Sequence, residues 1–205
     1  MKPIMQFMKE SEKVLSMIQY VAFLRGINVG GKNKVPMKDL KKLFEDLGYV
    51  NVKTYINSGN VIFSSPEKNQ GILIASLEPI LLETFNFEIP ITVVSVAALQ
   101  RVSDNAPEWW GDGNKEYYHT AVFVIPPKDA SAIMEIMGAH LDGKEYVEVG
   151  EAMIYWTAVV AYFSQTKWSK IASTDARNFV TIRTANTVRK ILALAATMTA
   201  SANED

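Results

Sequence analysis

The sequence has no cysteine and only two histidines, His119 and His140, among its 205 residues. Without cysteine the chain has no disulfide framework, no thiolate nucleophile and no cysteine-ligated zinc. Two histidines also exclude a histidine-rich metal site, and no pattern in the sequence indicates a metal or another cofactor. A chain free of cysteine is typical of a reducing compartment, so we expect the protein to be cytoplasmic.

Long apolar runs are also missing from the sequence. No run approaches the ~20 residues that span a bilayer, and we therefore expect no membrane association. The opening segment, residues 1–19, does not resemble a signal peptide, because Lys9, Glu10, Glu12 and Lys13 interrupt its apolar stretches. Apolar residues recur there at helical spacing, which predicts a helical extension ending before Tyr20.

The net charge is −1, but the charges are unevenly spread. Residues 20–63 carry seven Lys/Arg against three Asp/Glu, and residues 167–190 carry six against one. Residues 64–166 are acidic, with five against fourteen. This balance disfavours a globally basic nucleic-acid-binding protein. Two basic segments on an acidic background favour an anionic ligand where the segments meet in space.

Periodicity in the first half predicts an α+β unit. A short apolar strand is followed by a glycine-rich loop, a helix, a strand hairpin, a second helix and a last strand. This β-α-β-β-α-β order is that of a ferredoxin-like unit with an antiparallel sheet. The predicted strands are 20–24, 50–56, 61–63 and 89–94, and the predicted helices are 36–47 and 69–86.

The second half repeats the order β-α-β-β, which predicts a duplicated ferredoxin-like fold. A short helix over 95–105 closes the first half, 20–105, and a loop over 106–116 connects the halves. We expect Trp109 and Trp110 in that loop to cover the junction. The second half, 117–198, ends in a helix, and the tail 199–205 is expected to fray. Its predicted strands are 118–125, 145–149, 153–158 and 179–183, with helices after Pro127, near 167–172 and over 186–197.

The glycine-rich loop matches part of a phosphate-binding P-loop. Residues 26–32 fit the pattern G-x-x-x-x-G-K. However, Asn33 replaces the Ser/Thr that holds magnesium, and Pro36 delays the helix. These departures exclude an NTPase. The loop can still bind an anion, because its glycines expose backbone N–H groups and its lysines add charge; the alternative is a tight turn with solvated lysines.

We predict a ligand-binding site for an anion where this loop meets the turn at 57–60. In a ferredoxin-like sheet the first and third strands are neighbours, so both connections emerge at one end. The start of the last helix, with Thr184 as N-cap, is a possible third contributor. No histidine is near Ser58 in sequence, so nothing indicates a nucleophile or a reaction. The predicted site residues are Arg25, Asn28, Gly30, Gly31, Lys32, Asn33, Lys34, Asn57, Ser58, Gly59, Asn60, Arg183 and Asn186.

The stretch from Tyr20 to Phe63 resembles the opening of a bacterial family known as domain of unknown function 1697. The resemblance rests on LRGINVGGKN after a strand and on SGNV in the following hairpin. It implies an internally duplicated ferredoxin-like fold to about residue 198 and no settled activity. The family's closing T-x-R-N-W-x-T-V pattern is similar to residues 181–188, where Thr184 and Ala185 replace Asn and Trp.

Three functions fit these observations. The first is binding of a phosphorylated or otherwise anionic small molecule at the loop 25–34. The second is a protein–protein interaction module without catalysis, which contacts its partner through the Trp109-Trp110 loop or the N-terminal segment. The third is single-stranded RNA binding, with Tyr20, Phe23, Tyr55 and Phe63 as stacking surfaces on an open sheet face.

Overall fold

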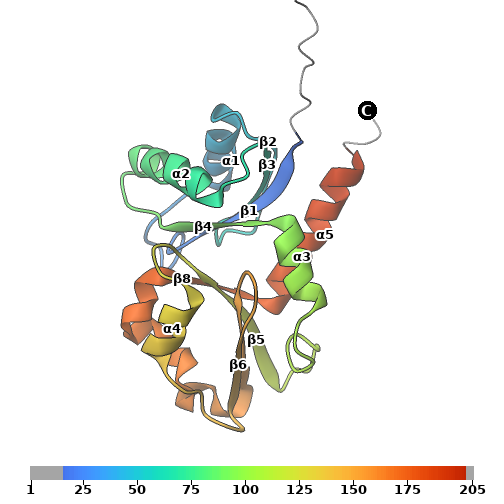
Figure 1. Cartoon of the computed structure of the whole chain (residues 1–205). Coiled ribbons are helices and arrows are strands. Elements are labelled where there is room, and N and C mark those ends of the chain that lie inside the picture. The colour runs from blue at the N-terminus through green and yellow to red at the C-terminus, as the bar shows by residue number, and fades with distance from the viewer. Residues whose placement is uncertain (1–15, 202–205) are drawn as a thin grey trace, which may run out of the picture.

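Two four-stranded antiparallel sheets form the centre of the protein in the computed structural model, which describes residues 16–201 (Figure 1). The strand order is β2-β3-β1-β4 in the first sheet and β6-β7-β5-β8 in the second. Each half of the chain contributes one sheet, and the protein is therefore mixed α+β, as predicted. The strands are β1 (Ile18–Leu24), β2 (Val50–Tyr55), β3 (Asn60–Ser65), β4 (Ile91–Ser95), β5 (Tyr117–Val124), β6 (Glu145–Val149), β7 (Ile154–Val159) and β8 (Val180–Thr184).

Helix boundaries follow the capping residues in the sequence. Asn69 and Ser95 accept hydrogen bonds from backbone N–H groups in the first turns of α2 and α3, and Thr184 does so for α5. None of the helices within residues 16–201 is long and apolar enough to cross a bilayer. The helices are α1 (Met37–Asp46), α2 (Gln70–Phe85), α3 (Val96–Asp104), α4 (Ala130–Met137) and α5 (Ala185–Ser201).

The predicted N-terminal helix is wrong at its C-terminal end. Ile18 and Gln19 lie in β1, where they pair with Ser65 and Ser64 of β3. Backbone pairing in the sheet therefore overrides the helical spacing of the apolar residues. The rest of the predicted extension, residues 1–15, lies outside the described residues.

The first hydrophobic core lies between the first sheet and helices α1 and α2 (Figure 1). Tyr20, Phe44 and Phe63 are its largest buried rings, and Phe63 contacts both of the others, at centroid distances of 5.7 Å and 5.2 Å. Two of the four aromatic side chains predicted on an open sheet face, Tyr20 and Phe63, are therefore inside this layer. Each such burial stabilises the fold by roughly 1.5–3 kcal/mol.

The second core joins the two halves. It lies between the sheets and includes side chains of α3 and α5. Phe23 of β1 and Phe123 of β5 stack at a centroid distance of 4.0 Å. Trp110 is buried in this cluster and donates from Nε1 to Thr120 O at 2.6 Å, while Trp109 packs against it half-buried. The prediction that these tryptophans cover the junction is confirmed.

The outer face of the second sheet is covered by α4 and three short 3₁₀ helices. These are Val160–Gln165, Trp168–Ser173 and Asp175–Phe179, whereas the sequence predicts only a helix near 167–172. The buried Glu145 carboxylate organises this region, because it accepts hydrogen bonds from the backbone N–H groups of Leu141, Lys167 and Trp168 and from Trp156 Nε1.

Candidate functional site

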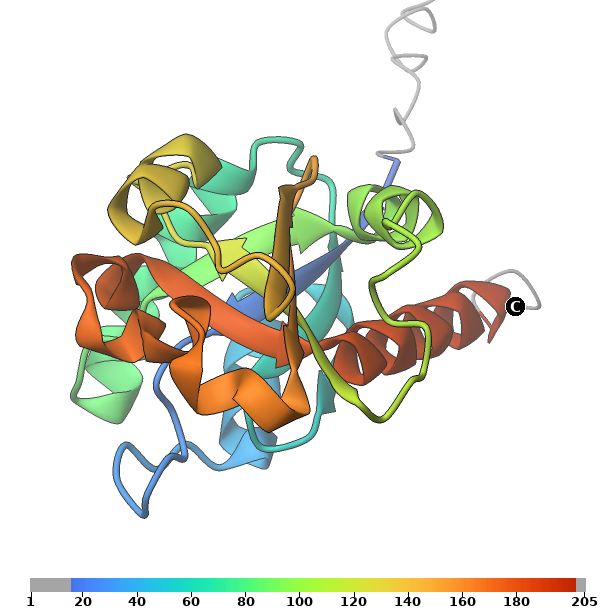
Figure 2. The same ribbon diagram turned by 90° about the horizontal axis from the view of Figure 1, so that it is seen from below.

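The glycine-rich loop projects from the body of the protein as a small hairpin, drawn in blue (Figure 2). Lys32 N donates to Val29 O at 3.0 Å, and the residues between them, Gly30 and Gly31, have φ of 58° and 75°. Two successive positive φ values are the signature of a type I′ turn. The turn therefore requires these two glycines. This agrees with the tight turn that the sequence left open as the alternative to an anion-binding loop.

Asn28 connects this loop to the turn that begins at Asn57. Its Nδ2 donates to Val35 O and to Asn57 O, each at 2.9 Å, and its Oδ1 accepts from Val35 N. On the opposite strand of the hairpin, Asn33 Nδ2 donates to Gly26 O at 3.0 Å. The two predicted segments thus meet, and both asparagines act as scaffold through their side-chain amides.

A groove of about 390 Å³ lies where the two segments meet. Among residues 16–201, Lys32 and Lys34 are the only charged residues that line it, and both are exposed. The start of α1 forms one wall, and its N-cap residue, Pro36, makes no side-chain capping hydrogen bond. The groove therefore combines two ammonium groups with the positive end of a helix. Its lining residues are Asn28, Gly31, Lys32, Lys34, Val35, Pro36, Met37 and Asn57.

Arg25 is half-buried but does not line the groove. The pKa of its guanidinium is lowered by burial and, to a lesser degree, by the charge of Arg177. Arg177 belongs to the second basic segment but was not among the predicted site residues. The two basic segments thus approach each other near Arg25, outside the lining of the groove.

Arg183 is buried and acts as a clamp between the halves of the chain. Its Nη2 donates to Leu24 O and Ser58 O, each at 2.8 Å, and to Gly59 O at 3.2 Å. Its Nε donates to Asn60 Oδ1 at 2.5 Å, while Nη1 donates to Thr181 Oγ1 and Ile182 O. Burial lowers the pKa of Arg183 to about 10. With all three nitrogens engaged, this guanidinium supports the turn and is not free to hold a ligand.

The rest of the predicted turn is also part of the scaffold. Asn60 is fully buried and donates from Nδ2 to Tyr55 O and Ser58 Oγ. Gly59 has φ of 76°, and a Cβ there would come within 2.7 Å of Leu24 Cβ. Only glycine fits this close approach. Asn57 alone among the four turn residues lines the groove.

Asn186 does not lie at the groove. It lines a separate hollow beside the connecting loop and the start of α5. The predicted site therefore combined residues that lie at two different places in the structure. The order of the predicted strands did not indicate at which end of the sheet the last helix begins. Conversely, Val35, Pro36 and Met37 form a wall of the groove but are apolar, so their sequence did not indicate a binding site.

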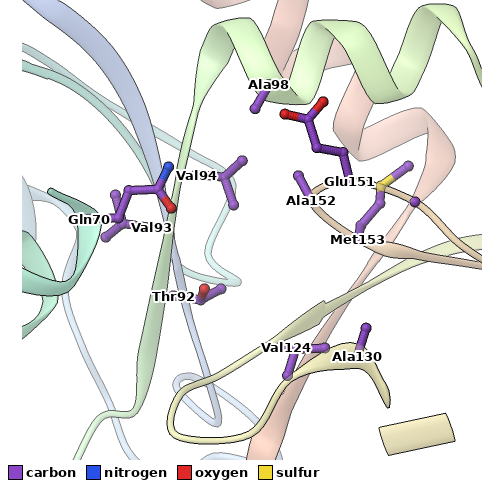
Figure 3. Close-up of a pocket in the computed structure, with 11 residues that line it drawn as sticks. Gln70, Thr92, Val93, Val94, Ala98, Val124, Ala130, Glu151, Ala152 and Met153 are labelled. Carbon is purple, nitrogen blue, oxygen red and sulfur yellow. The ribbon is translucent and has the colours of Figure 1, made fainter. Parts of the chain in front are cut away.

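Another hollow, of about 280 Å³, lies beside β4, α3 and the β6–β7 turn (Figure 3). Its lining includes the apolar side chains of Val94, Val124 and Met153 and the polar side chains of Gln70 and Thr92. Glu151 is its one charged lining residue, and its carboxylate forms an ion pair with Arg101. Because the cation is already paired and outside the lining, this hollow offers nothing to hold an anion.

The rings expected to stack on RNA bases are covered. Tyr20, Phe23 and Phe63 are each at most 1% exposed, because one sheet face packs on helices and the other on the second sheet. The expectation of an open aromatic face is therefore wrong for these three residues. Within residues 16–201, no three His, Asp or Glu side chains gather as potential metal ligands.

A comparison with models of known protein families assigns the chain to one of them. The model of the protein family of unknown function DUF1697 matches residues 17–155, more than half of the chain. The chain belongs to the DUF1697 family. The predicted family is therefore confirmed. No curated protein sequence matches the chain significantly.

This DUF1697 chain is also similar to a solved structure, that of the conserved bacterial protein SP0830 from Streptococcus pneumoniae. The two share 28% sequence identity, with a TM-score of 0.79. The similarity covers 88% of this chain and 99% of the other. It thus extends the shared α+β architecture beyond the residues that match the family model.

Proposed function

We propose that the groove between the glycine-rich loop and Asn57 binds a phosphorylated or otherwise anionic small molecule. The observation that carries this proposal is the lining of the groove, in which Lys32 and Lys34 face no carboxylate. Neither lysine has an ion pair within residues 16–201, so their charges are available to a ligand. No arrangement of nucleophile and base at the groove indicates a reaction, and the proposal is limited to binding.

The groove favours a ligand that has both an anionic group and an apolar part. Val35, Pro36 and Met37 provide an apolar wall beside the lysines. Each charge-assisted hydrogen bond contributes roughly 1.5–3 kcal/mol. Two or three such bonds correspond to a dissociation constant in the range of about millimolar to micromolar. The rigid Asn28 scaffold supports this affinity, because less of the loop has to be ordered on binding.

A thermal-shift screen of phosphorylated metabolites and nucleotides tests the proposal. We expect at least one ligand to raise the melting temperature of the wild-type protein, and Lys32→Gln and Lys34→Gln to reduce that rise. Lys68→Gln is the matched control, because Lys68 is an exposed lysine outside the groove. It should respond like the wild type.

The proposal is abandoned if no anionic ligand stabilises the protein, or if the two groove variants respond like the wild type. In that case, light scattering that shows self-association supports the alternative of a protein–protein interaction module. Binding of single-stranded RNA at low salt, with a steep salt dependence, supports the third possibility.

We also infer that the two sheets represent a duplicated ferredoxin-like fold, with halves at 20–105 and 117–198. The equivalent strand orders of the two sheets support this inference, since in both the first and third strands are central. The absence of cysteine supports a cytoplasmic location, which localisation of a tagged protein tests.

A further inference from the structure

The hollow that Asn186 lines has a volume of about 320 Å³ and lies between the connecting loop, the start of β5 and the start of α5. The connecting loop runs alongside the beginning of the red helix α5 (Figure 2). The two are in contact, because a Cβ at Gly111 would come within 2.5 Å of Arg189 Nη2. The hollow is lined by Gly111, Gly113, Asn114, Lys115, Tyr117, Tyr118, His119, Thr184, Ala185, Asn186 and Arg189.

Two unpaired cationic side chains line this hollow. They are Lys115 and Arg189, whereas no carboxylate of residues 16–201 lines it and the nearby Asp112 carboxylate contacts His119. Within residues 16–201 neither cation forms an ion pair, and the exposed amide of Asn186 makes no hydrogen bond. The positive end of the 17-residue helix α5 lies at the same place. All of these groups favour a negative charge in the hollow.

A buried histidine forms the inner wall. The side chain of His119 is only 8% exposed, and its Nδ1 lies 2.9 Å from Thr157 Oγ1. Its Nε2 is buried and lies 2.9 Å from Asp112 Oδ1, which is an ion-pair distance when the ring is protonated. Because its ring lines the hollow, His119 is sensitive to any charge that enters there.

We propose that this hollow is a binding site for a small oxyanion group, phosphate or carboxylate, held between Lys115, Arg189 and Asn186. The site is independent of the groove at Lys32, with which it shares no lining residue. Gly111 has φ of 71° and leaves room for the Arg189 guanidinium, so the backbone of the connecting loop lies against one of the two cations.

Proton NMR tests this site directly, because the chain has only two histidines. Titration of the wild-type protein with inorganic phosphate at constant ionic strength, and separately with succinate, should shift the His119 C2–H resonance along a saturable curve. His140 is the internal control, since it lies outside the hollow. The variant His140→Gln assigns the two resonances. Saturation by phosphate alone, succinate alone or both shows which oxyanion the site takes.

Variants separate this site from the groove. Lys115→Gln and Arg189→Gln should each weaken binding by roughly tenfold, as expected for the loss of one charge-assisted hydrogen bond. Lys32→Gln should leave the His119 curve unchanged even where it abolishes ligand binding at the groove. The two proposals can therefore fail separately.

The proposal is overturned if both histidine resonances drift linearly with phosphate and succinate, as in non-specific ion binding. It is equally overturned if the Arg189→Gln and Lys115→Gln proteins, shown to be folded by circular dichroism, give the wild-type His119 curve.

Discussion

Replacement of Arg183 by methionine should destabilise the protein and loosen the candidate groove. Methionine has a similar length but no donors, so the acceptors at Leu24, Ser58, Gly59 and Asn60 lose their partner together. A buried acceptor that is left without its partner costs about 1–3 kcal/mol, so at about 1.5 kcal/mol each the four acceptors together lose roughly 6 kcal/mol. Asn57, the first residue of the turn that Arg183 holds, lines the groove, so the same substitution should weaken ligand binding there.

The burial of the charge itself reduces the expected loss. The lowering of the Arg183 pKa from 12.5 to about 10 corresponds to about 3 kcal/mol by which burial disfavours the charged form. Methionine removes this unfavourable contribution together with the hydrogen bonds. Because the guanidinium also lies 5.5 Å from the Phe23 ring centre, it gains some attraction there. The difference between the roughly 6 kcal/mol lost at the acceptors and the about 3 kcal/mol regained leaves an expected net loss of about 2–4 kcal/mol in the free energy of unfolding.

Urea denaturation followed by tryptophan fluorescence measures this loss. For a chain of this length, 2–4 kcal/mol corresponds to a fall in melting temperature of about 10 °C. Arg101→Met is the matched control, because that guanidinium is exposed and pairs only with Glu151, and it should change stability much less. An Arg183→Met protein that is as stable as the control would refute the clamp.

Three further substitutions or conditions test other parts of the structure. Glu145→Gln should lower the free energy of unfolding by about 3 kcal/mol, because an amide NH₂ would face N–H donors. The control Glu148→Gln, at an exposed residue of the same strand, should have little effect in the same urea experiment. Gly59→Ala should lower it by about 2 kcal/mol, since alanine disfavours the positive φ and its Cβ would lie 2.7 Å from a side-chain carbon at the end of β1. A wild-type midpoint in either case contradicts the packing described. The hydrogen bond from Arg101 lowers the pKa of Glu151 in the folded state, so the unfolded state binds more protons in acid. The wild type should therefore be more stable than Glu151→Gln above the ordinary pKa of glutamate, and this difference should disappear as the pH falls through the lowered pKa. Denaturation curves of both proteins between pH 3 and 7 measure the difference.

Much of the fold could be predicted from local patterns in the sequence. Apolar periodicity together with proline, glycine and other turn residues predicted most elements within two residues of their observed ends. The N-terminal segment was an exception, because Ile18 and Gln19 fit a helical spacing but pair with β3. The 3₁₀ helices between β7 and β8 were another, since such short helices have no apolar period and depend on the buried Glu145.

The candidate site could be predicted only in part. The sequence placed the glycine-rich loop and the turn at 57–60 at one end of a sheet, and the structure joins them through Asn28. It did not separate residues that hold the loops from residues that are free for a ligand. Asn33, Ser58 and Asn60 were all predicted to bind, but their side chains are occupied by hydrogen bonds within the protein.

By itself, the sequence determined the α+β class, the order of the elements and the two basic segments, because these follow from periodicity, turn residues and charge along the chain. Only the tertiary structure decided what each basic residue does. Arg183 became a buried clamp, Lys32 and Lys34 remained free at a groove, and Asn186 and Arg189 went to a second hollow. The reason is physical: whether a charged side chain holds the protein together or faces a ligand depends on burial and on acceptors from distant parts of the chain, and local sequence does not encode either.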